Sequence, residues 1–218
     1  MREIKIQLKK QLKEINFLPL RKTKKMQNPT IKIKSTELLS DNHYILNKVI
    51  LDYIKNDGTI ETQTREVYDR GNGATILLYN KDKKTVILIR QFRLPTYLNG
   101  NKTGMIIEAC AGLLEEENPE ECIKRETEEE TGYTLTEVRK VFESYMSPGS
   151  VTEIIHFFVG EYSKEMKTSE GGGLDTEHEN IDVLELPFEK ALEMISTGEI
   201  KDAKTIMLLQ YAKINNLL

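Results

Sequence analysis

A short acidic segment sets the strongest constraint on how this chain folds. Residues 115–130 contain nine glutamates and two basic residues, which gives the segment a net charge of −7. Asn118 is a good helix N-cap, Pro119 suits the first helical position, and Gly132 suits the left-handed residue that ends a helix. The segment therefore predicts a helix over 119–131, whose charge must face either solvent or a cation.

The glutamates of this helix do not all have the same explanation. Those at its start favour the positive end of the helix dipole and are explained by capping and solvation. Glu126, Glu129 and Glu130 stand at i, i+3 and i+4, on one face near the C-terminal end, where negative charge is unfavourable. A hard divalent cation would make this cluster favourable, since Mg²⁺ prefers oxygen ligands. The neighbouring Arg125 could orient a carboxylate through its planar guanidinium.

Charge and composition exclude several classes of protein. A net charge of −4 and a pI near 5.6 over 218 residues argue against a general role at nucleic acid or at a membrane surface. Residues 1–25 are the exception, with nine Lys or Arg against two Glu, and we expect a solvated basic extension there. No apolar run of about 20 residues is present, and two cysteines imply no disulfide framework. We therefore expect a cytoplasmic protein with no membrane partner.

Apolar patterns along the rest of the chain predict strands, then the acidic helix, then further strands and C-terminal helices. This order predicts an α+β fold in which helices cover a mixed sheet. The two strands within 74–92 are apolar almost throughout, which indicates burial on both faces. The other predicted segments are strands within 44–69 and 139–162, a polar loop with three glycines over 163–180, and helices within 187–214 interrupted near Gly198.

The acidic helix also carries a family resemblance. The sequence "RETEEETG" at 125–132, with Gly112 thirteen residues before Arg125, resembles the Nudix box of hydrolases that act on nucleoside diphosphates linked to another group. Glu117 follows Gly112 by five residues, a shorter spacing than the general pattern, and this spacing is similar to that of the branch acting on GDP-mannose. Pro148 is similar to a proline that marks Nudix enzymes acting on nucleoside-diphosphate sugars.

The resemblance covers about residues 35–215, and it implies a fold and a division of the chain. The implied fold is an α/β/α Nudix sandwich around a mixed sheet, with a small N-terminal β-sheet subdomain. We expect a basic extension over 1–30, a dimer-forming β subdomain over 31–70 and the Nudix hydrolase domain over 71–218. The resemblance further implies a domain-swapped homodimer, in which the neighbouring subunit contributes residues to the site.

The resemblance also assigns metal ligands. It implies that Glu126 and Glu130 bind the metal together with the carbonyl of Ala111 and with Glu179, which lies in the loop after the three glycines. Glu177 lies two residues before Glu179 and could exchange roles with it. Two or three Mg²⁺ ions are implied, with Mn²⁺ as a possible substitute.

Substrate contacts and the general base follow from the same resemblance. The candidates for the base are Glu177, then Glu179, then Glu129, with Arg125 also in the catalytic group. The implied substrate-binding residues are Arg93, Ala111, Gly112, Glu130, Glu153, His178, Glu179 and Lys204, with His43, Thr64, Arg65 and Glu66 from the neighbouring subunit.

The implied activity is Mg²⁺-dependent hydrolysis of the pyrophosphate bond of GDP-mannose to GMP and mannose 1-phosphate. An alternative is the same chemistry on ADP-ribose or another ADP-sugar, because the motifs do not define the base pocket. Another is a module that binds a nucleotide sugar without cleaving it, although the full set of carboxylates on the acidic helix argues against this. A nucleic-acid partner for residues 1–25 is disfavoured because Phe17 is their only aromatic residue.

Overall fold

The computed structural model describes residues 28–115, 117–174, 176 and 179–218. The chain forms two compact units, of which the smaller comprises the described residues up to Thr36 together with Val49–Thr64. The larger comprises Glu37–Lys48 and Arg65–Leu218. None of the helices in the described residues is long and apolar enough to span a bilayer.

The N-terminal strands form a sheet of their own. Its order is β1-β2-β3, and a turn at Gly58, where φ is 85°, joins the last two strands. The residues Asn56-Asp57-Gly58 at this turn are of the kind that hairpin turns favour. The strands are β1 (Thr30–Asp41), β2 (Ile45–Ile54) and β3 (Ile60–Asp69).

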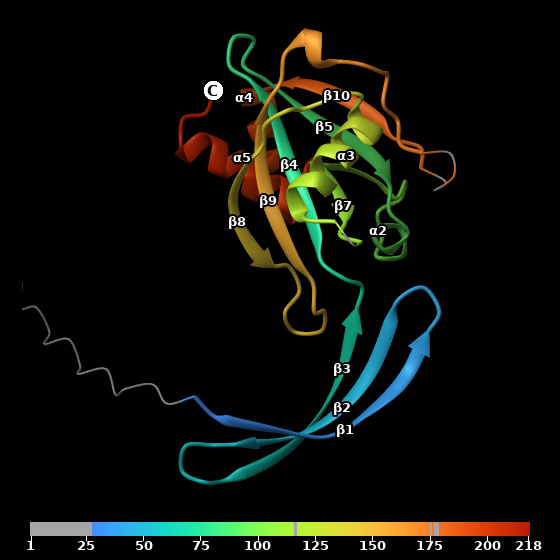
Figure 1. Ribbon diagram of the computed structural model, residues 1–218, viewed down its shortest axis with the longest axis vertical. Coiled ribbons are helices and arrows are strands. Elements are labelled where there is room, and N and C mark those ends of the chain that lie inside the picture. The colour runs from blue at the N-terminus through green and yellow to red at the C-terminus, as the bar shows by residue number, and fades with distance from the viewer. Residues whose placement is uncertain (1–27, 116, 175, 177–178) are drawn as a thin grey trace, which may run out of the picture. The chain divides into compact units, whose positions relative to one another are not determined.

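The larger unit is built on a seven-stranded mixed sheet (Figure 1). Its main path runs β10-β5-β4-β9-β8, while β6 pairs with β5 and β7 pairs with β4. The central pair β4 and β9 is parallel, and the other pairs with a recorded register are antiparallel. The strands are β4 (Gly73–Asn80), β5 (Thr85–Phe92), β6 (Met105–Glu108), β7 (Cys110–Leu113), β8 (Arg139–Tyr145), β9 (Ile154–Glu161) and β10 (Asp182–Pro187).

Helices cover both faces of this sheet (Figure 1). On one face, α3 (Pro119–Thr131) packs Cys122 and Ile123 against alternate residues of β4. On the other face, α4 (Phe188–Thr197) and α5 (Ala203–Ile214) pack against the intervening residues. Every residue of β4 is buried, because both of its faces are covered. The predicted α+β sandwich with a mixed sheet is therefore confirmed.

The boundaries of α3 follow from local chemistry. The side-chain oxygen of Asn118 accepts hydrogen bonds from the backbone N–H groups of Glu120 and Glu121, at 3.0 and 3.1 Å. At the other end Gly132 takes the left-handed conformation, with φ of 77°, and its N–H donates to the carbonyl of Glu128. The helix therefore begins and ends where the sequence predicted.

Several elements lie outside the predicted segments: β1, a 3-10 helix at Lys164–Met166, and four further elements of the larger unit. The strands β6 and β7 contain four residues each, which is too short for an alternating pattern to stand out. The short helix α2 (Leu94–Leu98) lies between β5 and β6, and β10 forms where the sequence predicted only the approach to a helix. All six residues of β10 find partners on β5, so tertiary pairing rather than local propensity defines this strand.

The loop after β9 closes the C-terminal end of α3. The N–H of Gly172 donates to the carbonyl of Glu130 at 2.9 Å, and the N–H of Gly173 donates to that of Glu129 at 3.1 Å. These carbonyls belong to the last turn of the helix, which has no partners of its own for them. A Cβ on Gly171 would lie 2.6 Å from the carbonyl oxygen of Glu130. The glycine run is thus a close-fitting cap that fixes this loop to α3.

This cap yields a prediction for Gly171→Ala. We expect the variant to lose about 1–3 kcal/mol of unfolding free energy, because an alanine at a φ of 69° is strained and its Cβ would meet helix backbone. Urea unfolding measures the loss. Gly149→Ala is the control, since a Cβ there meets nothing within 4 Å. Equal stabilities of the two variants would show that the glycine run does not cap α3.

Candidate functional site

Two acidic side chains on α3 face the strand β7: Glu130, which is buried, and Glu126, which is half-buried. The backbone N–H of Ala111 donates to Glu130 Oε2 at 3.1 Å, and Glu130 is 1% exposed. Gly112 lies so close to Glu126 that a Cβ in its place would collide with that carboxyl group. The backbone of β7 therefore forms a close-fitting wall for both acids, which only glycine at position 112 allows.

Burial makes these two acids resist ionisation. It raises the pKa of Glu126 to about 7, although Arg125 opposes the shift, and it raises the pKa of Glu130 to about 8. Each pKa is raised further by neighbouring negative charge, including that of Glu179. Buried carboxylates that repel one another are stabilised by a hard cation with oxygen preference. The residues present therefore fit a divalent metal ion.

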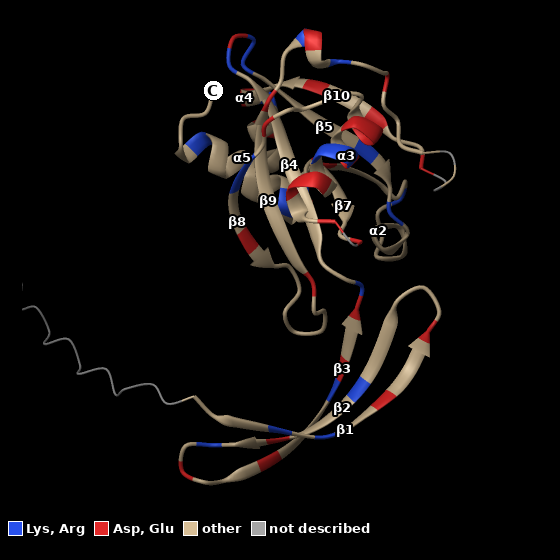
Figure 2. Ribbon diagram, viewed as in Figure 1, with Lys and Arg blue, Asp and Glu red and all other residues tan. Residues whose placement is uncertain are grey.

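Arg125 holds the acidic face together. Its Nη2 lies 2.6 Å from Glu117 Oε1 and 3.0 Å from Glu126 Oε1, and its Nη1 donates to Glu129 Oε2 at 2.8 Å. Acidic segments flank the basic Lys124 and Arg125 along α3 (Figure 2). The guanidinium group thus orients three carboxylates, one of which is that of Glu126.

The loop carboxylate Glu179 is anchored to the glycine cap. Its backbone N–H donates to the carbonyl of Leu174 at 3.3 Å, and its Oε2 accepts from the N–H of Leu174 at 3.2 Å. Within the described residues no three His, Cys, Asp or Glu side chains form a ready metal cluster. The predicted base candidate Glu177 and the predicted contact His178 lie outside the described residues.

A pair of cations is held nearby by a different carboxylate. Arg93 follows β5, and its Nε donates to Glu108 Oε2 at 2.7 Å. Lys204, in the first turn of α5, donates to Glu108 Oε1 at 3.0 Å and to Asp202 Oδ1 at 2.8 Å. The negative charge of Glu130 helps to raise the pKa of Arg93. The cations Arg93 and Lys204 therefore lie near the acids Glu126 and Glu130.

The remaining predicted residues lie in several places. Glu153 is buried just before β9, with its Oε1 3.5 Å from Arg70 Nε. His43 lies exposed in the turn between β1 and β2, with its ring centroid 4.3 Å from that of Tyr44. Three exposed residues of β3 complete the set: Thr64, Arg65 and Glu66.

Three acidic residues of the site were not predicted as site residues from the sequence. Glu117 was used only for its spacing, although it binds Arg125. Asp202 caps α5 by accepting from the N–H of Thr205 at 2.9 Å, and an Asp three residues before a Thr at a helix start is a detectable signal. Glu108 gives a weaker signal, as a single charge that ends an apolar run.

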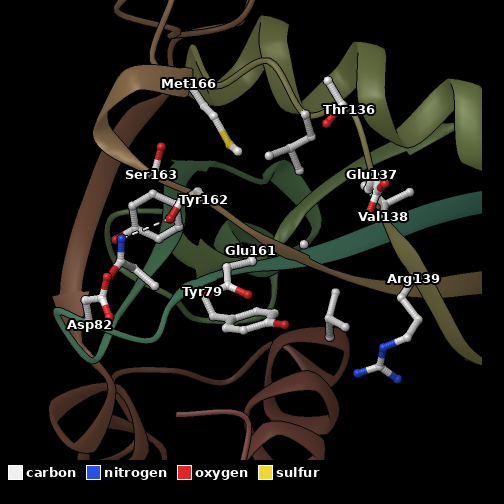
Figure 3. A pocket seen from close by; sticks show the side chains of 14 residues that line it. Tyr79, Asp82, Thr136, Glu137, Val138, Arg139, Glu161, Tyr162, Ser163 and Met166 are labelled. Atoms are coloured by element: carbon white, nitrogen blue, oxygen red, sulfur yellow. Dashed lines mark hydrogen bonds between the residues drawn. The ribbon is translucent and has the colours of Figure 1, made fainter.

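The cavities lie elsewhere in the larger unit. One of about 510 Å³ is lined by the ends of β4 and β9 and by the start of β8 (Figure 3). None of the predicted site residues lines it. A second, of about 460 Å³, lies beside the glycine loop and includes Gly171 and Gly172. Neither of these two cavities is lined by Glu126, Glu130, Arg93 or Lys204.

Two family profiles match this chain. The one described as the NUDIX domain covers residues 69–209, and the one described as the GDP-mannose pyrophosphatase NudK N-terminal domain covers residues 30–68. A GDP-mannose pyrophosphatase from Escherichia coli O1:K1 / APEC is 56% identical over 188 residues, which is 86% of this chain and 97% of that protein. A GDP-mannose pyrophosphatase from Shigella dysenteriae serotype 1 (strain Sd197) is 58% identical over 182 residues, which is 84% of this chain and 94% of that protein.

A solved structure shares the fold. The crystal structure of an ADP compounds hydrolase superposes with a TM-score of 0.66 and covers 90% of this chain and all of its own. The sequences are 18% identical, so this likeness concerns the fold alone.

The substitution Glu130→Gln tests how the ionisation of Glu130, next to Glu126, affects stability. Folding favours the protonated form of Glu130, because its pKa is about 8 in the folded protein against an ordinary 4.5. This contribution to stability is fully present below pH 4.5 and is lost as the pH rises through about 8. We expect the metal-free wild type to lose on the order of a few kcal/mol relative to the variant over this interval.

Thermal unfolding of both proteins at several pH values measures this difference. Addition of Mg²⁺ at pH 8 should raise the unfolding temperature of the wild type and have little effect on the Gln variant. Parallel pH curves with equal responses to Mg²⁺ would contradict the account of the pair.

Proposed function

The chain belongs to the Nudix hydrolase family, and from that premise we propose that it hydrolyses the pyrophosphate bond of GDP-mannose to GMP and mannose 1-phosphate. The observation that supports this most is the pair of acids on α3, the buried Glu130 and the half-buried Glu126, set against β7 in a chain 56–58% identical to GDP-mannose pyrophosphatases. Such a pair has no use in a module that only binds a sugar, whereas hydrolysis of a diphosphate needs metal ions.

Glu126, Glu130 and the carbonyl of Ala111 would hold the divalent metal, with Glu179 as the loop ligand. Bound Mg²⁺, or Mn²⁺ in its place, would supply charge neutralisation and an acidified water, and we propose two or three ions. The protein's part is to keep the acids in place. The N–H of Ala111 fixes Glu130 and Arg125 fixes Glu126, so little side-chain freedom remains to be lost on binding.

A glutamate is proposed to accept the proton of the attacking water. Our order of candidates is Glu177, then Glu179, then Glu129. Glu129 is held by Arg125 at 2.8 Å, which limits its reach, and Glu179 is held by the N–H of Leu174 at 3.2 Å. Arg125 serves the reaction by fixing the acidic face.

The substrate is proposed to bind through fixed positive charge. Arg93 and Lys204 would contact the phosphate oxygens, because charge-assisted hydrogen bonds to phosphate are among the strongest in proteins. The backbone at Ala111 and Gly112 would lie beneath the diphosphate. Glu153 would contact the nucleotide or the sugar, as would the loop residue His178.

A second copy of the chain is proposed to complete the site. In a domain-swapped homodimer, the segment 31–70 would bring His43 and Thr64–Glu66 to the partner's site. Exposed aliphatic side chains along β1 support this proposal, since such a row is usually covered in an assembly. They are Ile31, Ile33, Leu38 and Leu39. The cytoplasm is the proposed location, which suits the free thiols of Cys110 and Cys122.

Steady-state hydrolysis with Mg²⁺ tests the function. GDP-mannose and ADP-ribose are supplied separately, and the products are identified by chromatography. We expect GDP-mannose to be preferred and to yield GMP and mannose 1-phosphate. Preference for ADP-ribose would retain the chemistry and overturn the substrate, and binding without turnover of either would favour the non-catalytic alternative.

Two variants of α3 test the site in the same assay. Glu126→Gln should lower kcat/KM by at least about 100-fold, because it removes a metal ligand. Glu120→Gln is the matched control, since Glu120 lies at the start of the same helix and, among the described residues, forms a salt bridge only with Lys124, on the surface. Wild-type activity in Glu126→Gln would contradict the assignment of this acid.

A further inference from the structure

One buried carboxylate joins two cations from distant parts of the chain. Glu108 ends β6 and is 5% exposed. Its Oε2 accepts from Arg93 Nε at 2.7 Å, and its Oε1 accepts from Lys204 Nζ at 3.0 Å. Since Arg93 and Lys204 lie 111 residues apart in the sequence, this single side chain determines how close their charges come.

The positive charges of Arg93 and Lys204, bound to the same carboxylate, would repel each other without the negative charge between them. Lys204 is largely buried, with a side chain 16% exposed. Burial lowers the pKa of Lys204, but Glu108 and Asp202 outweigh it, so the net direction is upward. The lysine therefore remains a cation in a place where an unpaired ammonium would lose its charge.

A second set of hydrogen bonds connects Lys204 and Asp202 to the segment 108–111. Asp202 Oδ2 accepts from the Oγ1 of Thr205 at 2.7 Å, and that Oγ1 accepts from the N–H of Ala109 at 2.6 Å. Ala109 directly follows Glu108, and Ala111, two residues later, donates to Glu130. The segment 108–111 therefore fixes both the cation pair and the acidic pair.

Arg93 keeps donors available beyond this contact. Its bond to Glu108 uses Nε, and the side chain is 42% exposed. Within the described residues neither Nη atom makes a recorded hydrogen bond. A guanidinium held along one edge presents its remaining N–H groups in a fixed direction, which suits the oxygens of a phosphate.

We propose that Glu108 is a positioning residue, which holds Arg93 and Lys204 at a fixed separation and directs both at the diphosphate of the substrate. Glu108 itself does not touch the substrate in this proposal, because both of its oxygens are occupied by the two cations. The proposal rests on the proposed function, through the assignment of a nucleoside-diphosphate sugar as substrate.

Glu108→Gln tests the proposal, because it keeps the shape of the side chain and removes its charge. We expect KM for GDP-mannose to rise at least about tenfold, with a smaller change in kcat, as one charge-assisted hydrogen bond has about that effect. Glu185→Gln is the control, since Glu185 also accepts from a lysine and two hydroxyl groups but lies on β10, on the opposite edge of β5 from Glu108. An unchanged KM in Glu108→Gln would overturn the proposal.

A double-mutant comparison separates positioning from general damage to the fold. In an Arg93→Ala background, Glu108 positions only Lys204. The effect of Glu108→Gln on KM should therefore be at least about threefold smaller than in the wild-type background. If Glu108 matters only for stability, the effect on KM will be the same in both backgrounds. Equal effects would overturn the proposal.

Binding of inorganic pyrophosphate gives a readout that does not depend on which nucleotide sugar is cleaved. Titration calorimetry in the presence of Mg²⁺ should show weaker binding to Glu108→Gln than to the wild type. Weaker binding together with a wild type inactive on GDP-mannose would overturn the proposed substrate and support the positioning role. Equal binding by both proteins, or none by the wild type, would overturn the positioning role.

Discussion

The structure depends on holding two acidic side chains of α3, one buried and one half-buried, against the backbone of β7. Glu126 and Glu130 are withdrawn from water on α3, and burial raises the pKa of both. This arrangement is unfavourable for a protein alone, because ionised carboxylates resist burial and repel one another. The surrounding contacts orient the two acids without neutralising both. Positive charge from outside the chain then has a prepared place, which is what metal-assisted hydrolysis requires.

The rest of the site is arranged around one short segment of backbone. Residues 108–111 connect the acids of α3 to the cations Arg93 and Lys204, through Ala111 on one side and Glu108 on the other. In the proposed reaction, this segment would place both the acids that hold the metal ions and the cations that contact the diphosphate. The glycine cap also shapes the site, because it fixes the loop that carries Glu179 to the C-terminal end of α3.

What the sequence could predict depends on the range of the interactions involved. The ends of α3 were predictable because Asn118 and Gly132 act on backbone within their own turn. The positions of Arg93 and Lys204 came from family resemblance, since each is an ordinary basic residue when taken alone. The bonds of Glu108 to both, and the cap that Gly172 forms on α3, join segments far apart in the chain. No local pattern encodes such contacts, and only the folded sheet brings them together.

The most direct measurement of the central claim is anomalous diffraction from crystals of this protein grown with Mn²⁺. We predict a strong anomalous peak between Glu126 and Glu130, with oxygens of both acids and the carbonyl of Ala111 at ligand distance. Anomalous peaks only at other sites, or none at all with Mn²⁺ in excess, would contradict it. The acids of α3 would then need an explanation other than metal binding.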